Sequence, residues 1–461
     1  MKGYNNEVME STSENLMTRG SIPGKILRFA FPVFLGNLFQ QLYSTVDALI
    51  VGNFVGTDAL AAVSATGTLV FLLISFFEGI AIGAGVAVSR YFGAEDDRNV
   101  SLAVHTNIAF ALSVGVLLSV LGPLAAPVIL RWMGTPADIL PQASAYVRIY
   151  FGGILTLVMY NTCRGILQAV GDSRHPLIYL IISSVTNVVL DLVFICIFRM
   201  GVEGAAIATI LSQLLSAALC ILRLLRTPDA FGIRIRRIGF DGPMLKEIIN
   251  YGVPTGVQNS VIAFANVIVQ SCINVFGTLA VAGCGAYTKL EGFGFLPITA
   301  FNIALTTFVG QNLGAREFER AKKGAAFGIV CAILLAEAIG VSFDFAAPQL
   351  IGLFTADAAA IAFGVQKMRI VSLFYCLLAA THSFAAILRG AGKSVIPMAV
   401  MLICWCLFRV VFLTITTPIY HNIALVNWVY PISWSASTVI LIIYYIRADW
   451  IHGFEKQESS L

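Results

Sequence analysis

The segment FAFPVFLGNLFQQLYSTVDALIVG, from Phe29 to Gly52, decides the fold of this chain. It is long and apolar enough to cross a bilayer, since a spanning helix needs roughly 20 mainly apolar residues. An ionised carboxylate that faces lipid costs about 2.5 to 3.5 kcal/mol. Steps of three and four residues place polar side chains on one helical face, namely Asn37, Gln40, Ser44 and Asp47, with Gln41 beside them. We therefore expect this face to point into protein or into a water-filled cavity.

Pro32 lies in the same segment, about four helical turns before Asp47. A proline inside a helix removes one hydrogen bond and permits a bend. The segment thus combines a titratable group with a predicted hinge.

The composition is typical of a polytopic membrane protein. Of 461 residues, 58% are hydrophobic and 12% are charged, with a mean hydropathy of +0.85, whereas soluble domains carry about 25% charged residues. Hydropathy predicts an all-α integral membrane protein with twelve transmembrane helices. The expected spans are 26–52, 60–90, 100–123, 140–169, 176–198, 203–225, 247–275, 282–311, 322–347, 362–388, 395–418 and 425–446.

Lys and Arg gather in the loops that follow the even-numbered spans, and the opposite loops hold almost none. The positive-inside rule therefore predicts that both termini are cytoplasmic. A basic stretch near the midpoint is interpreted as a cytoplasmic linker beside the anionic leaflet, in preference to a nucleic-acid site. The expected domains are a tail (1–25), an amino-terminal lobe (26–225), the linker (226–246), a carboxy-terminal lobe (247–447) and a tail (448–461).

The two lobes are internal repeats. VGDSRHP at 170–176 recurs as AGKSVIP at 391–397, and YFGAEDDR at 91–98 recurs as NLGAREFE at 312–319, each 221 residues later. Because each lobe has an even number of helices, both have the same orientation. We therefore expect a pseudo-two-fold axis along the membrane normal, an architecture typical of carriers that rock one bundle against another.

These features resemble the multidrug and toxic compound extrusion (MATE) family. The resemblance is carried by the pattern P-x14-D-x4-G at Pro32, Asp47 and Gly52, by VGQNLGA at 309–315 and by the two six-helix lobes. It implies a secondary active antiporter that exports amphiphilic, mostly cationic organic compounds in exchange for H⁺ or Na⁺ by a rocker-switch mechanism. It also implies no organic cofactor, and partners that are small-molecule drugs and the lipid bilayer, with no nucleic acid. We expect a monomer in the inner or plasma membrane.

The same resemblance implies an ion-coupling site in the amino-terminal lobe. It comprises Asp47, Asn187, Asp191, Tyr146 and Thr209, with Pro32 as the hinge and Na⁺ as a possible occupant of Asp47, Asp191 and Asn187. Asn187 and Asp191 also share a helical face with Ser183 and Ser184. Two carboxylates in one dry cavity cannot both ionise easily, so they would titrate as a pair.

The substrate cavity is expected to draw on both lobes. Helix seven lacks the acidic residue that some MATE proteins carry there, so we place ion coupling in the amino-terminal lobe alone. Glu78 is either a contact for a cationic substrate or a buried hydrogen-bond acceptor, and Glu337 is expected to pair with Arg409. The predicted cavity residues are Gln40, Gln41, Ser44, Glu78, Asn161, Asn266, Gln270 and His382.

Two other classes of function are less consistent with the sequence. A flippase for a lipid-linked saccharide would need a basic cavity, and helices one and seven hold no interior Lys or Arg. A membrane enzyme would need a nucleophile or metal motif, and no H-x-x-x-H, C-x-x-C or G-x-S-x-G occurs. A flippase for a lipid-linked saccharide and a specific metabolite exporter, both of the same two-lobe superfamily, stay alternatives to multidrug efflux.

Overall fold

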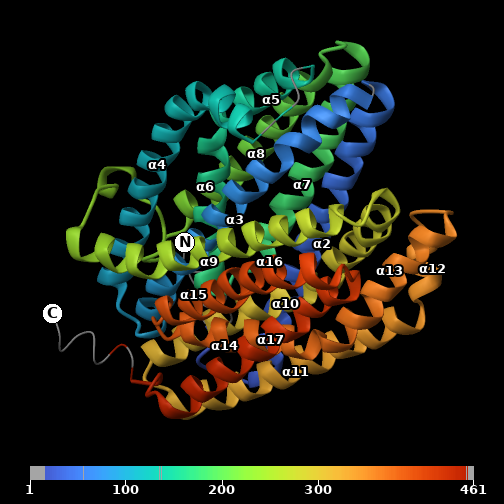
Figure 1. Cartoon of the computed structure of the whole chain (residues 1–461). Helices are drawn as coiled ribbons and strands as arrows, with labels where there is room; N and C mark the ends of the chain where they lie inside the picture. Colours follow the sequence, from blue (N-terminus) through green and yellow to red (C-terminus); the bar gives the residue numbers. More distant parts are fainter. Residues whose placement is uncertain (1–15, 56, 134, 136–137, 453, 455–461) are drawn as a thin grey trace. The chain divides into compact units, whose positions relative to one another are not determined.

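A computed structural model describes residues 16–55, 57–133, 135, 138–452 and 454 of the chain. The described residues form helices joined by short loops (Figure 1). Most of the two predicted tails, at 1–15 and 455–461, lies outside the described residues. In a bilayer this architecture is favoured because a helix satisfies all backbone hydrogen bonds internally.

Helices of the first half of the chain are α2 (Ile22–Phe54), α3 (Thr57–Gly93), α4 (Asp97–Trp132), α5 (Leu140–Gly152), α6 (Ile154–Ala169), α7 (Arg174–Asp191), η1 (Leu192–Ile197), α8 (Gly201–Arg226) and η2 (Ile235–Arg237). Helices of the second half are α9 (Gly242–Asn274), α10 (Thr278–Gly314), α11 (Phe318–Phe345), α12 (Ala347–Gly352), α13 (Ala358–Val371), η3 (Ser372–Phe374), α14 (Tyr375–Gly390), α15 (Val395–Met401), η4 (Leu402–Leu407), α16 (Phe408–Tyr420) and α17 (Ile423–Arg447).

Within the described residues, eleven helices are long and apolar enough to cross a membrane. The helices α5 and α6 are bent by 47° at their junction and make the twelfth span when they are counted together. The prediction of an all-helical, twelve-span membrane protein is confirmed. The expected domain borders stay a prediction.

Contacts group the described chain into two compact units. Of the described residues, the first unit holds 16, 35–55, 57–133, 135 and 138–252, and the second holds 17–34, 253–452 and 454. Helix α2 therefore begins in the second unit and continues in the first, and the change falls beside Pro32.

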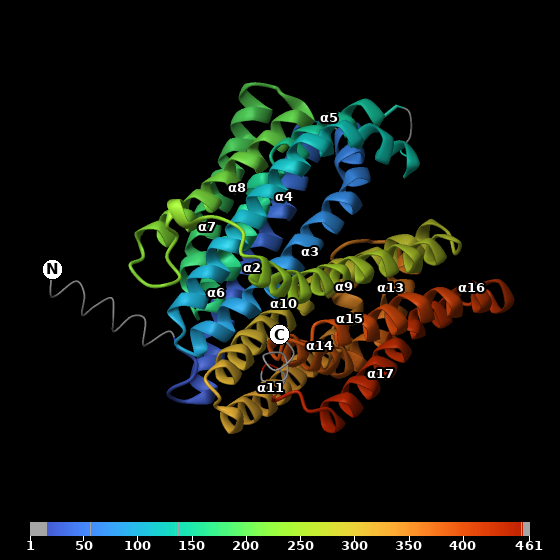
Figure 2. The same ribbon diagram turned by 90° about the vertical axis from the view of Figure 1, so that its left-hand side faces the viewer.

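In the first unit, α6 is the central helix. It packs against α3, α4 and α8, and α8 also packs against α7 (Figures 1 and 2). Helices α3 and α6 approach closely at Gly165, where an added Cβ would lie 2.8 Å from the carbonyl oxygen of Ala81. A side chain at this position would push the two helices apart.

In the second unit, α14 has the equivalent role. It packs against α10, α11 and α17, and every residue from 378 to 390 is buried. Its burial is possible because this stretch is mostly Ala, Leu and other small or apolar residues.

The internal repeat is visible in the backbone of the loops. Glu95 and Arg316 both have positive φ, at 55° and 59°, and Gly171 and Gly392 have φ of 88° and 75°. The members of each pair are 221 residues apart, as the sequence repeat requires. The two homologous halves therefore share loop conformations that few residue types adopt readily.

The basic linker is held against α4. The backbone N–H of Arg234 donates to His105 Nε2 at 2.9 Å, and that of Asp241 donates to Thr106 Oγ1 at 3.4 Å. The next helix, α9, begins at Gly242.

Candidate functional site

Two carboxyl groups meet inside the first unit. Asp47 on α2 and Asp191 at the end of α7 lie within hydrogen-bonding reach of each other. Asp191 is 0% exposed. Among the described residues, no group donates a hydrogen bond to Asp47 Oδ1 or to either carboxylate oxygen of Asp191, although all three atoms are buried.

The chemistry of such a pair follows from its electrostatics. Two adjacent carboxylates repel when both are ionised, and burial removes the water that would stabilise either. One proton or one small cation between them would relieve both costs. Asp191 is also followed by η1, a wider π-helical turn, and such turns are frequent at functional sites.

Three further residues of the predicted coupling site are buried in the same unit. Tyr146 is 6% exposed, lies near both acids and stacks on Tyr150. Asn187 lies one turn before Asp191 and is 1% exposed, and neither of its amide atoms has a hydrogen-bond partner within the described part of the chain. The Thr209 hydroxyl donates to the carbonyl of Ala205 on its own helix at 3.0 Å.

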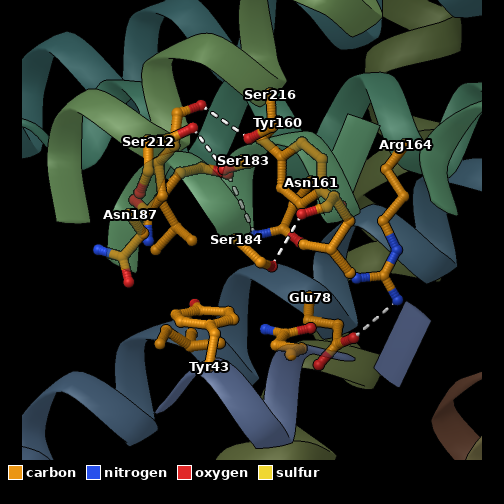
Figure 3. A pocket seen from close by; sticks show the side chains of 15 residues that line it. Tyr43, Glu78, Tyr160, Asn161, Arg164, Ser183, Ser184, Asn187, Ser212 and Ser216 are labelled. Carbon is orange, nitrogen blue, oxygen red and sulfur yellow. Dashed lines mark hydrogen bonds and ion pairs between the residues drawn. The ribbon is translucent and has the colours of Figure 1, made fainter. Parts of the chain in front are cut away.

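Figure 3 shows a polar pocket in the same unit. Its lining includes Tyr43 and Asn187, which lie one helical turn before Asp47 and Asp191. Its empty volume is about 480 Å³, counting space that is open to solvent. Its lining residues are Gln40, Tyr43, Ile74, Glu78, Leu157, Tyr160, Asn161, Arg164, Leu180, Ser183, Ser184, Asn187, Ser212, Gln213 and Ser216. The pocket thus brings together three of the predicted cavity residues, at positions 40, 78 and 161, with Asn187 of the predicted coupling site.

The serines of the pocket present acceptors. Ser183 Oγ donates to the carbonyl of Ser212 at 2.5 Å, Ser184 Oγ to that of Leu180 at 2.8 Å, and Ser216 Oγ to that of Gln213 at 2.9 Å. A hydroxyl has one donor and two lone pairs, so each oxygen keeps its acceptor capacity. The wall is therefore suited to a ligand that carries N–H or O–H donors.

Glu78 is in an ion pair that the sequence analysis missed. Arg164 Nη2 on α6 lies 3.3 Å from Glu78 Oε1 on α3, and the side chains are 8% and 36% exposed (Figure 3). The carboxylate keeps access to the pocket while it compensates the buried guanidinium. An arginine in the apolar run of α6 was the available signal.

Three of the pocket residues come from α8. Ser212, Gln213 and Ser216 recur at steps of one, three and four within an otherwise apolar helix. The same spacing rule that identified the polar face of α2 would have identified this face.

Other predicted cavity residues lie elsewhere. Gln41 and Ser44 are not in the lining of this pocket. In the second unit, Asn266 Oδ1 accepts from Arg409 at 3.4 Å, and Gln270 Nε2 donates to Asn274 at 3.0 Å.

His382 is 7% exposed in the second unit. Its ring packs edge-on against Phe295 and Trp405, with centroids 5.0 and 5.4 Å apart. The role of His382 in a substrate cavity stays a prediction.

The expected pairing of Glu337 with Arg409 is wrong. Glu337 Oε2 accepts the backbone N–H of Cys376 at 3.1 Å, whereas Arg409 Nε donates to Ser433 Oγ at 3.0 Å. Opposite charge and a shared lobe were insufficient to predict this contact. The rotation of each helix about its axis decides which neighbouring helix its side chains face.

Comparisons with known proteins agree with this fold. The MatE family model matches residues 32–193 and again 254–415, one match in each half. The probable multidrug resistance protein YpnP of Bacillus subtilis is 29% identical over 86% of this chain and 88% of its own length. The FAD transporter of Shewanella oneidensis is 24% identical over 83% of this chain and 84% of its own.

A solved structure has the same fold. The crystal structure of MATE in the bent conformation superposes with a TM-score of 0.87 and 24% identity, and covers 96% of this chain and 98% of that one.

Proposed function

Because this chain belongs to the MATE family of transporters, we propose that it is a secondary active antiporter that exports amphiphilic, mostly cationic organic compounds in exchange for H⁺ or Na⁺. One observation carries the proposal. A pocket rich in hydrogen-bond acceptors lies one helical turn from Asp47 and Asp191, whose buried carboxylate oxygens accept no hydrogen bond from the described residues. We place both termini in the cytoplasm, as the distribution of Lys and Arg favours.

In the coupling step, the substrate cation and the coupling ion compete for the negative charge of Asp47 and Asp191. A cationic substrate in the pocket is stabilised by Glu78 and by the ionised form of the pair at Asp47 and Asp191. When a proton or Na⁺ occupies the pair, its net charge becomes less negative and its attraction for the substrate cation falls. Substrate release and ion uptake are therefore linked.

The mechanical step runs along α2. This helix carries Asp47 in the first unit and Pro32 at the change from one unit to the other. Neutralising Asp47 removes its demand for polar surroundings, and Pro32 lets the helix bend in response. The loaded protein then turns inward and releases the ion.

The experiment is efflux of a cationic dye from proteoliposomes, with pH and Na⁺ gradients imposed separately. Wild type should respond to one gradient, and Asp47→Asn should lose that response. Glu203→Gln is the matched control, because Glu203 is an exposed acid at the start of α8 in the same unit. Gradient-dependent efflux that survives in Asp47→Asn would contradict the coupling assignment.

One observation favours the second candidate, a specific metabolite exporter. The pocket is lined mostly by hydroxyl, amide and charged groups, and Arg164 adds a positive charge to it. One relative is named an FAD transporter. Uptake of flavins or nucleotides by inverted vesicles, with no transport of cationic dyes, would support this alternative.

A further inference from the structure

The second unit contains buried cations that lack a counter-charge in direct contact. In the first unit, buried Arg164 has the carboxylate of Glu78 at 3.3 Å. In the second unit, Lys367 on α13 and Arg409 on α16 are 2% and 1% exposed. Among the described residues, neither has a carboxylate oxygen within 4.0 Å.

Aromatic rings surround these two cations instead. Lys367 Nζ lies 5.4 Å and Arg409 Cζ lies 4.6 Å from the centre of one ring, that of Tyr430 on α17. Lys367 also faces the ring of Tyr287 at 5.1 Å, and Arg409 faces that of Trp405 at 5.0 Å. Ring faces attract cations but replace only part of the lost hydration.

Glu291 on α10 is the acid that interacts with both cations. The Glu291 carboxylate interacts electrostatically with Lys367 and Arg409. Its Oε1 accepts a hydrogen bond from the hydroxyl of Tyr287 at 3.1 Å. One carboxylate balances one of two positive charges. The cluster formed by Lys367, Arg409 and Tyr430 therefore keeps one positive charge that Glu291 does not compensate. An uncompensated charge inside a membrane-embedded unit is costly.

Unused hydrogen-bond donors lie in the same cluster. Arg409 Nη2 is buried and has no hydrogen-bond partner in the described ranges, while Nε and Nη1 of the same side chain donate to Ser433 and Asn266. Asn427, one turn before Tyr430 on α17, is 0% exposed, and no described residue forms a hydrogen bond with either of its amide atoms. Native structures rarely leave such groups unpaired, so the cluster has donors that a bound anion could use.

We propose that the second unit binds one small monovalent anion, chloride or a carboxylate group, at the cluster formed by Lys367, Arg409 and Tyr430. Such an anion brings the charge of the cluster, including Glu291, to zero. Its lone pairs accept from the guanidinium, which cannot lose its proton to escape the charge. This site lies in the other unit from the coupling pair and does not depend on the proposed transport function.

The test uses bromide as the probe and purified full-length protein in detergent micelles. Bromide quenches tryptophan fluorescence on contact, and Trp405 lies 5.0 Å from Arg409. Bromide is titrated against isethionate, a larger sulfonate without a carboxylate group, at constant ionic strength. We expect a saturable quenching component, added to the linear component from Trp132, which is 84% exposed.

Variants locate the site. Lys367→Met and Arg409→Gln should weaken the saturable component at least tenfold, and Arg409→Lys should restore part of it. Lys323→Gln is the control, because Lys323 is an exposed cation in α11 of the same unit, and it should match wild type. Competition by chloride and by acetate then separates the two sources: acetate competes only when the site accepts a carboxylate group.

The outcomes that overturn the proposal are strictly linear quenching in wild type, or an unchanged saturable component in Arg409→Gln. If the variants do not fold, the wild-type measurement still decides. The thermal stability of the wild-type protein should rise with chloride in a saturable manner relative to isethionate, and a chloride-independent midpoint together with linear quenching would refute the site.

Discussion

Removing Glu78 should destabilise the first unit more than removing Arg164, although the two form one ion pair. The Arg164 side chain is 8% exposed and that of Glu78 is 36% exposed, with 3.3 Å between Nη2 and Oε1. Glu78→Gln leaves a buried guanidinium without a counter-charge. Arg164→Met leaves a carboxylate that still reaches the water of the pocket.

The magnitudes follow from this difference in burial. Breaking a fully buried pair by removing one partner costs about 3 to 5 kcal/mol. Solvent reaches Glu78 and screens the interaction, so we expect about 2 kcal/mol for Glu78→Gln and about 1 kcal/mol for Arg164→Met. The double variant should lower the free energy of unfolding by less than the sum of the two single effects, because it leaves no unpaired charge.

The assay is equilibrium unfolding of the purified protein in mixed micelles, followed by circular dichroism. The control is Glu319→Gln, which removes an exposed pair with Lys322 and should leave the unfolding free energy unchanged. The reasoning is refuted if Arg164→Met costs as much as Glu78→Gln, or if the double variant shows strict additivity.

Three further predictions follow from the same packing. Ser183→Ala removes the hydrogen bond to the carbonyl of Ser212 and should cost about 1 kcal/mol of unfolding free energy; Thr186→Ala, which loses a hydrogen bond on the exposed side of α7, should cost less in the same assay. Gly165→Ala should lower the free energy of unfolding by about 1 to 3 kcal/mol, because the added Cβ clashes with α3. Gly285→Ala, where a Cβ meets nothing within 4 Å, should leave the protein equally or more stable. A larger loss of stability for Gly285→Ala than for Gly165→Ala would contradict this packing. Pro32→Ala should raise the thermal midpoint, since proline inside a helix costs about 3 kcal/mol, and should slow dye efflux several-fold; unchanged efflux would argue against the hinge.

Much of the fold could be predicted from the sequence because the signals are local. The twelve spans follow from stretches of apolar residues, and the twin halves follow from motifs repeated 221 residues apart. The loop conformations at Gly171 and Gly392 match for the same reason, since equivalent motifs make equivalent turns.

The candidate site was predicted only in part. The polar face of α2 and the residues Asn187 and Asp191 could be identified by periodicity and resemblance, but the partnership of Glu78 with Arg164 was missed. Spacing along one helix says which side chains share a face. It does not predict which residues of a neighbouring helix those side chains will contact.

The sequence by itself determined that the chain is a two-lobed helical membrane protein with an acidic group on its first span. Only the tertiary structure decided that Glu78 compensates Arg164 and that Glu337 and Arg409 have different partners. The physical reason is that hydropathy acts on each segment separately. Side-chain contacts between helices depend instead on the rotation and axial position of each helix, which the packing of the whole unit sets.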